Sequence, residues 1–261
     1  MKISNKKIDG GKSFDWGRTS SDYAKYRDIY PQEFYDKIMQ RGFGIPGQTL
    51  LDLGTGTGVL PRNLASHGAK WVGVDQSPEQ IQAAKLLSEG KNIEYIASAA
   101  EDLSFPNAFF DGITACQCFW YFDHKTLAPL LARLLKHGGR FLVLCMEWLP
   151  YDDPIAGASE ELVLRYHPSW SGKGATMQPI SIPSEYDAFF EQTYHEEFLL
   201  RVPFTRESWN ERMKSCRGIG ASLSQEQIDL WEKEHMDLLA RIAPPAFEVL
   251  HYGAIAELTL R

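Results

Sequence analysis

Three glycines at alternating positions follow an aspartate: after Asp52 come Gly54, Gly56 and Gly58. An apolar run precedes them and apolar residues at helical spacing follow, so the stretch predicts a strand, a tight turn and a helix. Glycine is needed where the backbone takes a positive φ or must approach a ligand closely. The N–H groups that open the following helix point back into the turn. This unit therefore predicts a small-molecule site.

Two kinds of nucleotide-type ligand compete for this turn. The dinucleotide fingerprint G-x-G-x-x-G would need its third glycine at position 59, where the chain has Val59. The third glycine is Gly58 instead, and Asp52 stands two residues before the first. A carboxylate there would repel a pyrophosphate and attract the ammonium of an amino-acid group. Asp75, at the tip of the second predicted strand, suits a ribose diol because a carboxylate accepts from two hydroxyls.

The elements that must position these residues alternate between strand and helix from about residue 48 to 147. This alternation predicts a parallel sheet wrapped by helices. The predicted strands are 49–53, 71–74, 93–97, 111–116 and 141–145. Helices are expected at 57–67, from Ser77 to Gly90, and from Asp123 to the Gly138-Gly139 pair. Open α/β sheets bind ligands at the carboxyl ends of their strands, which is where the turn and Asp75 lie.

The flanks differ from this core. Pro31 begins a predicted helix, and residues 148–187 are loop-rich, which is typical of a lid or binding loop. An extended stretch (196–202), two helices (205–216 and 224–242) and a last strand (247–260) are expected after it. We therefore divide the chain within one structural domain. Its parts are an N-terminal helical cap (1–47), the core (48–147), lid insertions with the penultimate strand (148–245) and the final strand (246–261).

Composition limits the classes of protein to consider. The chain has 261 residues, a net charge of -7 and a pI near 5.5, which disfavours a surface that follows phosphate backbones. The N-terminus holds no apolar stretch of the kind a signal peptide needs, and the most apolar run, 141–146, is too short to span a bilayer. We expect a cytoplasmic protein without a membrane or nucleic-acid partner.

The four cysteines, at positions 116, 118, 145 and 216, are too few for a disulfide framework in a chain of this length. Cys116 and Cys118 form a C-x-C pair, and His124 follows. A second clustered pair is missing from the neighbouring sequence, so we interpret the two thiols as structural or site-lining and expect no metal.

Four segments in a fixed order make the chain resemble the class I S-adenosylmethionine (SAM)-dependent methyltransferases. The segments are 51–58, 73–77, 100–105 and 110–117. The resemblance is to the small-molecule branch, which includes the ubiquinone-biosynthesis and trans-aconitate enzymes, and it is strongest over about 48–147. It implies a Rossmann-like, doubly wound α/β fold. The sheet would be mostly parallel and seven-stranded, with an antiparallel last strand and a lid of helices and loops.

The resemblance also implies which residues contact SAM and the product S-adenosylhomocysteine (SAH). The glycine turn would hold the methionine part of SAM. Asp75, at the end of the second strand, would bind the ribose hydroxyls, and Gln76 would flank the adenine. The third segment would reach the adenine edge, and the end of the fourth would lie beside the reactive methyl. The residues so implied are Asp52, Gly54, Thr55, Gly56, Asp75, Gln76, Ala100, Glu101, Cys116 and Gln117.

Two further features bear on the cofactor. Residues 23–27 match a segment that folds over SAM in relatives, which adds Tyr23 and Arg27. Arg27 could clamp the SAM carboxylate, or it could stand on a solvated helix face. The chain departs from the family at Ala99, where an aspartate often accepts from the adenine amino group. That contact would then come from Glu101, Ser98 or water.

Methyl transfer from a sulfonium is an in-line displacement, so the protein must mainly align the reacting groups and exclude water. A general base is needed only if the nucleophile arrives protonated. Tyr121 and Glu147 are the candidates for that base, with a structural or cofactor contact as the alternative. Trp120, Trp148 and Arg217 are candidates for the substrate pocket, and for the two tryptophans the alternative is packing in the core. For Arg217 the alternative is an exposed arginine at a helix end.

We therefore expect a monomeric or homodimeric SAM-dependent methyltransferase that acts on O, N or C of a small molecule. Three alternatives remain. Val59 and Asp52 disfavour an NAD(P)-dependent oxidoreductase. The acidic charge and the lack of an appended basic domain disfavour an RNA or protein methyltransferase. A non-catalytic SAM-binding module would use nearly the same residues, so it stays open.

Overall fold

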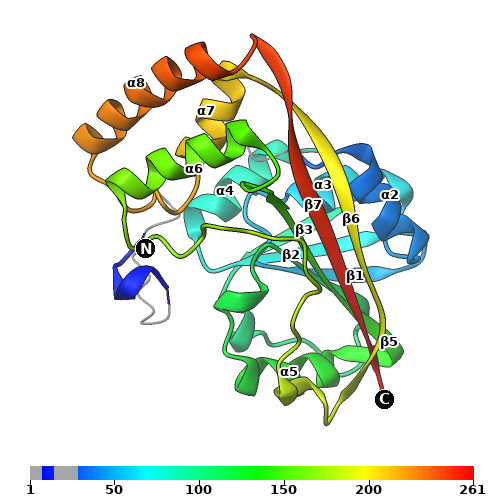
Figure 1. Cartoon of the computed structure of the whole chain (residues 1–261). Helices are drawn as coiled ribbons and strands as arrows, with labels where there is room; N and C mark the ends of the chain where they lie inside the picture. The colour runs from blue at the N-terminus through cyan, green and yellow to red at the C-terminus, as the bar shows by residue number, and fades with distance from the viewer. Residues whose placement is uncertain (1–7, 15–28) are drawn as a thin grey trace. The chain divides into compact units, whose positions relative to one another are not determined.

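Seven strands form one sheet in the computed structural model, which describes residues 8–14 and 29–261 (Figure 1). The order across the sheet is β3-β2-β1-β4-β5-β7-β6. The strands are β1 (Thr49–Leu53), β2 (Lys70–Asp75), β3 (Ile93–Ala97), β4 (Phe110–Cys116), β5 (Leu135–Trp148), β6 (Phe190–Thr205) and β7 (Ala246–Leu260). The pairs β1–β2, β1–β4, β2–β3 and β4–β5 are parallel, which confirms the predicted Rossmann-like core.

The last strands run antiparallel. The Arg261 N–H donates to the Phe189 carbonyl at 3.0 Å, and the Thr193 and Thr259 hydroxyls meet at 2.9 Å. From the first of these contacts to the second, the residue number rises from 189 to 193 on the side of β6 and falls from 261 to 259 on the side of β7. The two strands therefore run in opposite directions. The predicted antiparallel last strand is confirmed, and β6 is much longer than the stretch 196–202 that the sequence suggested.

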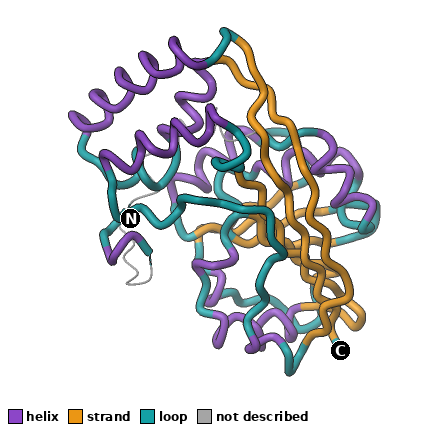
Figure 2. The backbone as a smooth tube through the Cα atoms, viewed as in Figure 1, coloured by secondary structure: helices purple, strands orange, loops and turns teal. Residues whose placement is uncertain are grey.

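Helices and short 3₁₀ turns connect the strands (Figure 2). The helices are α2 (Gln32–Gln40), α3 (Val59–Leu64), α4 (Pro78–Leu87), α5 (His124–Leu134), α6 (Pro154–Tyr166), α7 (Arg206–Lys214) and α8 (Gln225–Ile242). The 3₁₀ turns are η1 (Asp9–Gly11), η3 (Ala65–His67), η4 (Ala100–Asp102), η5 (Phe119–Tyr121) and η6 (Ser184–Tyr186). The predicted caps are confirmed: the Ser77 side chain accepts from the Gln80 N–H, and the Asp123 side chain accepts from the Lys125 N–H.

Two predicted boundaries are wrong. The helix expected to reach Gly138 ends at Leu134, because Leu135 already pairs with Phe110 of β4 and strand pairing overrides local helix propensity. The segment 148–187 was expected to be loop-rich, but it contains the 13-residue helix α6. Its signal was the pair Asp153-Pro154: the aspartate caps two N–H groups and the proline occupies the first turn.

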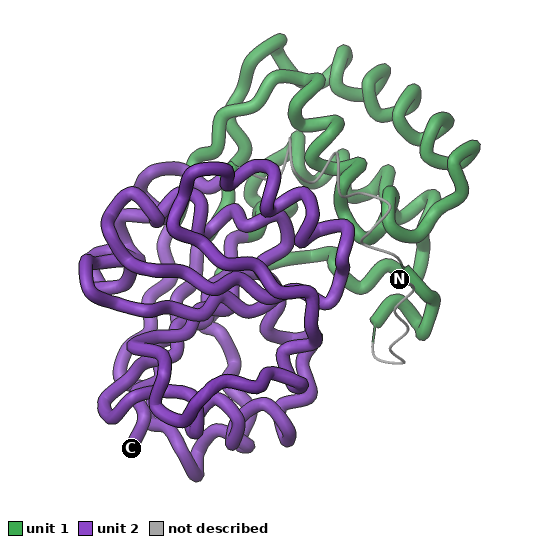
Figure 3. The backbone as a smooth tube through the Cα atoms, turned by 180° about the vertical axis from the view of Figure 1, so that it is seen from behind, with its two compact units in different colours: residues 1–29, 147–177, 199–252 green, residues 30–146, 178–198, 253–261 purple. Residues whose placement is uncertain are grey.

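The chain forms two compact units (Figure 3). Unit 1 comprises Met1–Ile29, Glu147–Met177 and Leu199–Tyr252, and unit 2 comprises Tyr30–Met146, Gln178–Phe198 and Gly253–Arg261. Strands β5, β6 and β7 contribute residues to both. The arrangement of the predicted segments as one structural domain stays a prediction. Among the helices of the described residues, none is long and apolar enough to cross a membrane.

In unit 1, α8 packs against α6 and α7, and a buried polar network joins the three helices. His235 of α8 contacts Asn210 of α7 through Nδ1 at 2.9 Å and Ser159 of α6 through Nε2 at 3.0 Å. Burial lowers the pKa of His235 to about 3, so the imidazole is neutral at physiological pH. A fully buried histidine with both nitrogens bonded has a structural role.

In unit 2, Glu257 of β7 is only 2% exposed and accepts from two arginines. Its Oε2 lies 2.9 Å from Arg41 Nε, and its Oε1 lies 3.4 Å from Arg140 Nη1. Removing one partner of a buried ion pair leaves the other charge uncompensated.

We expect Glu257→Ala to lower the free energy of unfolding by about 2 kcal/mol. Glu94→Ala should change it by less than about 0.5 kcal/mol, because its ion pair with Lys70 is exposed. Urea denaturation would compare the two, and equal losses would contradict the expectation.

Candidate cofactor and active site

The strand register of unit 2 brings the predicted motifs to one edge of the sheet. Leu53 of β1 pairs with Val74 of β2 on one side and with Ala115 of β4 on the other. The next residues along these parallel strands are Gly54, Asp75 and Cys116. The glycine turn, the acid and the thiol therefore stand side by side at the carboxyl ends of three adjacent strands, where open α/β sheets bind ligands.

The glycine turn has the backbone that the sequence predicts. Gly54, Gly56 and Gly58 have φ angles of 57°, 56° and 76°, in the left-handed region that side chains disfavour. At Gly54 the space is also closed, since a Cβ atom would lie 2.7 Å from Cys118 Cβ. The Cys118 thiol donates to the Leu53 carbonyl at 3.1 Å, so it is a structural thiol that packs under the turn.

Asp75 connects the turn to the next helix. Its Oδ2 accepts from the Gly56 N–H and its Oδ1 accepts from the Ser77 N–H, both at 2.9 Å. Burial raises the pKa of Asp75, and these two backbone hydrogen bonds oppose the rise. Each carboxylate oxygen keeps a second lone pair, so the fixed carboxylate can still accept from ligand hydroxyls. Gln76 beside it is exposed.

Asp52 lies deeper, with 2% of its surface exposed. The Thr114 hydroxyl of β4 donates to its Oδ1 at 2.6 Å. Burial raises the pKa of Asp52 to about 7, and the hydrogen bond from Thr114 counters part of that rise. A cationic ligand group near Asp52 would favour the ionised form.

The raised pKa of Asp52 makes stability depend on pH. Between the ordinary value of 3.8 and about 7, the folded protein holds a proton that the unfolded chain has released. Stability therefore falls as the pH rises through this window. Asparagine has no carboxyl group to titrate, so we expect the stability of Asp52→Asn not to fall in this way. The unfolding free energy of the variant minus that of the wild type should therefore grow from pH 4 to pH 7. Urea denaturation at several pH values would measure the difference. A difference that does not change with pH would contradict the expectation.

Gln117 follows β4 and has an uncommon backbone. Its φ is 62°, which a non-glycine residue adopts only where the surroundings enforce it, often at functional sites. Its N–H donates to the Leu144 carbonyl at 3.0 Å, and its side-chain amide donates to the Met146 carbonyl. The end of β4, where the reactive methyl is expected, is thus held rigidly against β5.

The Cys116 thiol donates to the Tyr30 hydroxyl at 3.4 Å. Sequence reasoning did not select Tyr30. Its only local signal is its place directly before the proline that opens α2, which says nothing of a contact with β4.

The residues predicted at the adenine edge are partly engaged within the protein. Ala100 and Glu101 lie in η4, and Glu101 Oε1 accepts from the Asp123 N–H at 2.8 Å. The Ser98 hydroxyl donates to the Ala99 carbonyl at 3.0 Å. The side chains that could replace the family's aspartate therefore already bind protein groups, and their adenine contacts stay predictions.

The candidates for catalysis and substrate binding fall into both units. In unit 2, Tyr121 ends η5 half-buried, and Trp120 beside it is 42% exposed, as a ligand-contacting aromatic would be. In unit 1, Glu147 is half-buried, whereas Trp148 packs into the core against Trp209, with ring centroids 5.8 Å apart. The Trp148 contacts indicate a packing role.

Arg217 is buried in an ion pair, which contradicts one of the two interpretations of the sequence. It is 9% exposed, so the exposed helix-end arginine is wrong. Its Nε donates to Asp9 Oδ2 at 2.7 Å within unit 1, and its Nη2 donates to the Ser171 hydroxyl at 3.0 Å. Asp9 already balances the charge of Arg217, and a role of Arg217 in binding an acidic substrate stays a prediction. Tyr23 and Arg27 lie outside the described residues.

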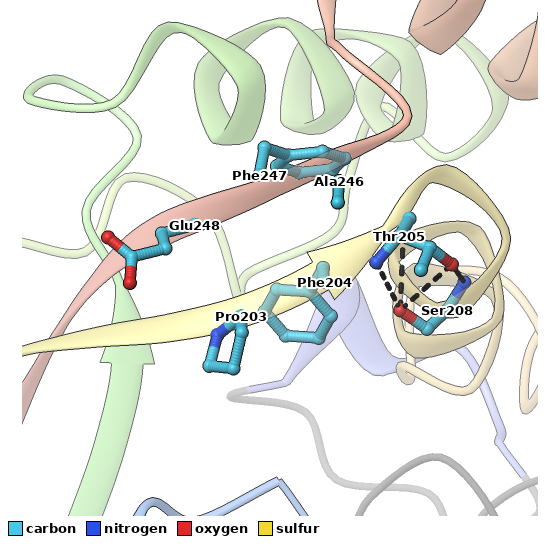
Figure 4. A pocket seen from close by; sticks show the side chains of 7 residues that line it. All are labelled: Pro203, Phe204, Thr205, Ser208, Ala246, Phe247 and Glu248. Atoms are coloured by element: carbon cyan, nitrogen blue, oxygen red, sulfur yellow. Dashed lines mark hydrogen bonds between the residues drawn. The ribbon is translucent and has the colours of Figure 1, made fainter.

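A separate cavity of about 500 Å³ belongs to unit 1 (Figure 4). It is lined by Pro203, Phe204, Thr205, Ser208, Ala246, Phe247 and Glu248. Figure 4 shows that its hydrogen bonds join Thr205 and Ser208, which cap α7. The cavity holds none of the predicted site residues. Across 8–14 and 29–261, no group of three His, Cys, Asp or Glu is placed to hold a metal ion.

Comparison with known proteins agrees with this geometry. A family model described as a methyltransferase domain matches residues 51–143, which contain the glycine turn, Asp75 and the end of β4. Residues 51–143 therefore form a methyltransferase domain, and the chain resembles the class I SAM-dependent methyltransferases. This family uses SAM as the methyl donor, and the turn, Asp75 and the end of β4 fit that group, because they form one edge with a fixed carboxylate.

The methyltransferase core is similar to that of ubiquinone biosynthesis O-methyltransferases. The protein from Vibrio vulnificus (strain YJ016) is 29% identical over 153 residues, which cover 56% of this chain and 65% of the relative. The protein from Serratia proteamaculans (strain 568) is 34% identical over 128 residues, which cover 48% and 53%. The chain thus spans about half to two thirds of the length of the curated relatives it matches.

Solved structures show the same fold at low identity. YjhP from E. coli superposes with a TM-score of 0.54 at 19% identity, covering 95% of this chain and all 100% of the other. A candidate methyltransferase from Bacillus halodurans gives 0.53 at 18% identity, covering 86% and 97%. At this identity the likeness concerns the fold alone.

Proposed function

We propose that this protein transfers a methyl group from SAM to a small molecule. The observation that carries the proposal is the register that places Gly54, Asp75 and Cys116 together at one sheet edge, inside a matched methyltransferase domain. The names of the curated relatives, ubiquinone biosynthesis O-methyltransferases, support a small-molecule acceptor. The net charge of -7 does not favour a nucleic acid.

The residues of unit 2 would divide the work of holding the cofactor. The N–H groups of the turn and the Asp52 carboxylate would bind the amino-acid end, and Asp75 would accept from the ribose hydroxyls. Gln117 would line the site beside the reactive methyl, and its side-chain amide is kept in place by the hydrogen bond that it donates to the Met146 carbonyl. When bound, SAM would supply an electrophilic methyl group on a positively charged sulfur.

Beyond binding, the chain must orient the acceptor and exclude water. Trp120 would contact an acceptor beyond the end of β4, and its exposed side chain in η5 supports that role. Tyr121 and Glu147 stay the candidates for a general base, which an acceptor that arrives protonated would require. The cytoplasmic location and the choice between monomer and homodimer also stay predictions.

Isothermal titration calorimetry of the full chain with SAM, SAH and NADH tests the proposal. We expect both SAM and SAH to bind at one site per chain and NADH not to bind. Failure of both SAM and SAH to bind would overturn the proposal. Incubation with methyl-labelled SAM and separate pools of small metabolites, tRNA and protein then tests the acceptor class. Label in the small-molecule pool supports the proposal, and label only in RNA or protein, or in none of the pools, contradicts it.

A further inference from the structure

We propose that Tyr30 is a cofactor-contacting residue, which faces the positively charged sulfur of SAM beside Cys116. The inference rests on the proposed function and adds a residue that no motif in the sequence indicated. It is carried by a contact between two segments that are 86 positions apart in the chain.

The first step is the position of the Tyr30 hydroxyl. It accepts from the Cys116 thiol at 3.4 Å, and Cys116 directly follows Ala115, which pairs with Leu53 at the start of the glycine turn. The phenol oxygen therefore lies beside Cys116, at the carboxyl edge of the sheet. In the proposed function this edge is where the methionine part of SAM ends in its sulfur.

The second step is the rigidity of the Tyr30 ring. It stacks on Phe34 with centroids 4.7 Å apart and an interplanar angle of 14°, and it meets Tyr35 edge-on at 6.1 Å. The Tyr35 hydroxyl in turn accepts from Asn63 Nδ2 at 2.8 Å, and Asn63 belongs to α3, the helix that begins at the glycine turn. Three aromatic rings thus fix the phenol relative to the turn, as a binding group requires. Tyr30 is only half-buried, so part of its surface remains open to a ligand.

The third step is chemical. An aromatic face and a phenol oxygen both present negative charge density, which attracts a desolvated cation. The sulfonium of SAM is such a cation, whereas the sulfur of SAH is neutral. A tyrosine at this place would favour SAM over SAH, so its removal should change the ratio of the two affinities. A tyrosine that only supports the fold would weaken both ligands equally.

Calorimetric titration of the full chain with SAM and with SAH measures this ratio. We expect Tyr30→Phe to lower the preference for SAM by about threefold and Tyr30→Ala by about tenfold. Tyr194→Phe is the matched control, because the Tyr194 hydroxyl donates to Glu196 at 2.8 Å rather than contacting Cys116, and its ratio should equal that of the wild type. Thermal denaturation checks that each variant is folded. If Tyr30→Ala does not fold, Tyr30→Phe still tests the inference, because it keeps the aromatic ring and removes only the hydroxyl.

The outcomes separate the inference from the proposed function. If the wild type binds neither ligand, the proposed function fails. If the wild type binds both but the ratio is unchanged in Tyr30→Phe and in folded Tyr30→Ala, the inference is overturned while the function stands. An equal loss of affinity for both ligands, or the same shift of the ratio in Tyr194→Phe, also overturns it. A second readout is the alkylation of Cys116 by iodoacetamide, measured by peptide mass spectrometry. We expect SAH to slow this alkylation. An unchanged rate at saturating SAH contradicts the inference.

Discussion

Replacing Gly58 with alanine is expected to lower the free energy of unfolding by about 3 to 4 kcal/mol. Two costs add. The residue has a φ of 76°, which disfavours a side chain, and a Cβ atom would lie 2.0 Å from the Tyr95 hydroxyl oxygen. Tyr95 is 6% exposed and its hydroxyl is bonded to Ser88 at 2.9 Å, so the ring cannot swing away without breaking that bond. Chemical denaturation monitored by tryptophan fluorescence would measure the loss.

Gly90 supplies the matched control for this substitution. Its φ of 80° is equally left-handed, but a Cβ atom there would meet nothing within 4 Å. Gly90→Ala should therefore cost only about 1 to 2 kcal/mol, the backbone part alone. The double variant Gly58→Ala/Tyr95→Phe should recover part of the loss, because the clashing oxygen is gone. Equal losses for Gly58→Ala and Gly90→Ala would show that contact with Tyr95 does not matter.

Asp75→Asn is expected to weaken SAH binding by about 30-fold to 100-fold, because the ribose hydroxyls lose a charged acceptor. The exchange also replaces one carboxylate oxygen by an NH₂ group, which would then face the N–H of Gly56 or Ser77 as a second donor. The turn should therefore lose its link to α4 as well as its ligand contact. Calorimetry with SAH measures the affinity directly.

Asp111→Asn is the control for Asp75→Asn. Asp111 also accepts from a backbone N–H, that of Thr49 at 2.7 Å, and it forms an ion pair with Lys136. It stands at the amino end of β4, however, and the ligand edge is at the carboxyl end. This variant should lose stability while its affinity for SAH stays that of the wild type. Unchanged SAH affinity in Asp75→Asn would refute the assignment of the ribose site.

The sequence alone determined the core of unit 2 and its ligand edge. The turn at Gly54 to Gly58 and the cap at Ser77 have the predicted conformations, and Asp75 lies at the predicted end of the second strand. Their signals are local, because positive φ, capping and strand periodicity depend on a few consecutive residues. Parallel strands then bring their carboxyl ends to one edge, so the order of the motifs was enough to assemble the site.

Only the tertiary structure decided the long-range pairs. Tyr30 meets Cys116 across 86 positions, and Arg217 meets Asp9 across 208. Trp148 looked like a pocket residue and packs into the core of unit 1, because burial depends on which helices arrive beside a strand. Side-chain type and spacing predict the conformation of the nearby backbone. They do not predict which distant segment of the chain will contact a given side chain. The backbone of the glycine turn could therefore be predicted, and the Tyr30 hydroxyl beside Cys116 could not.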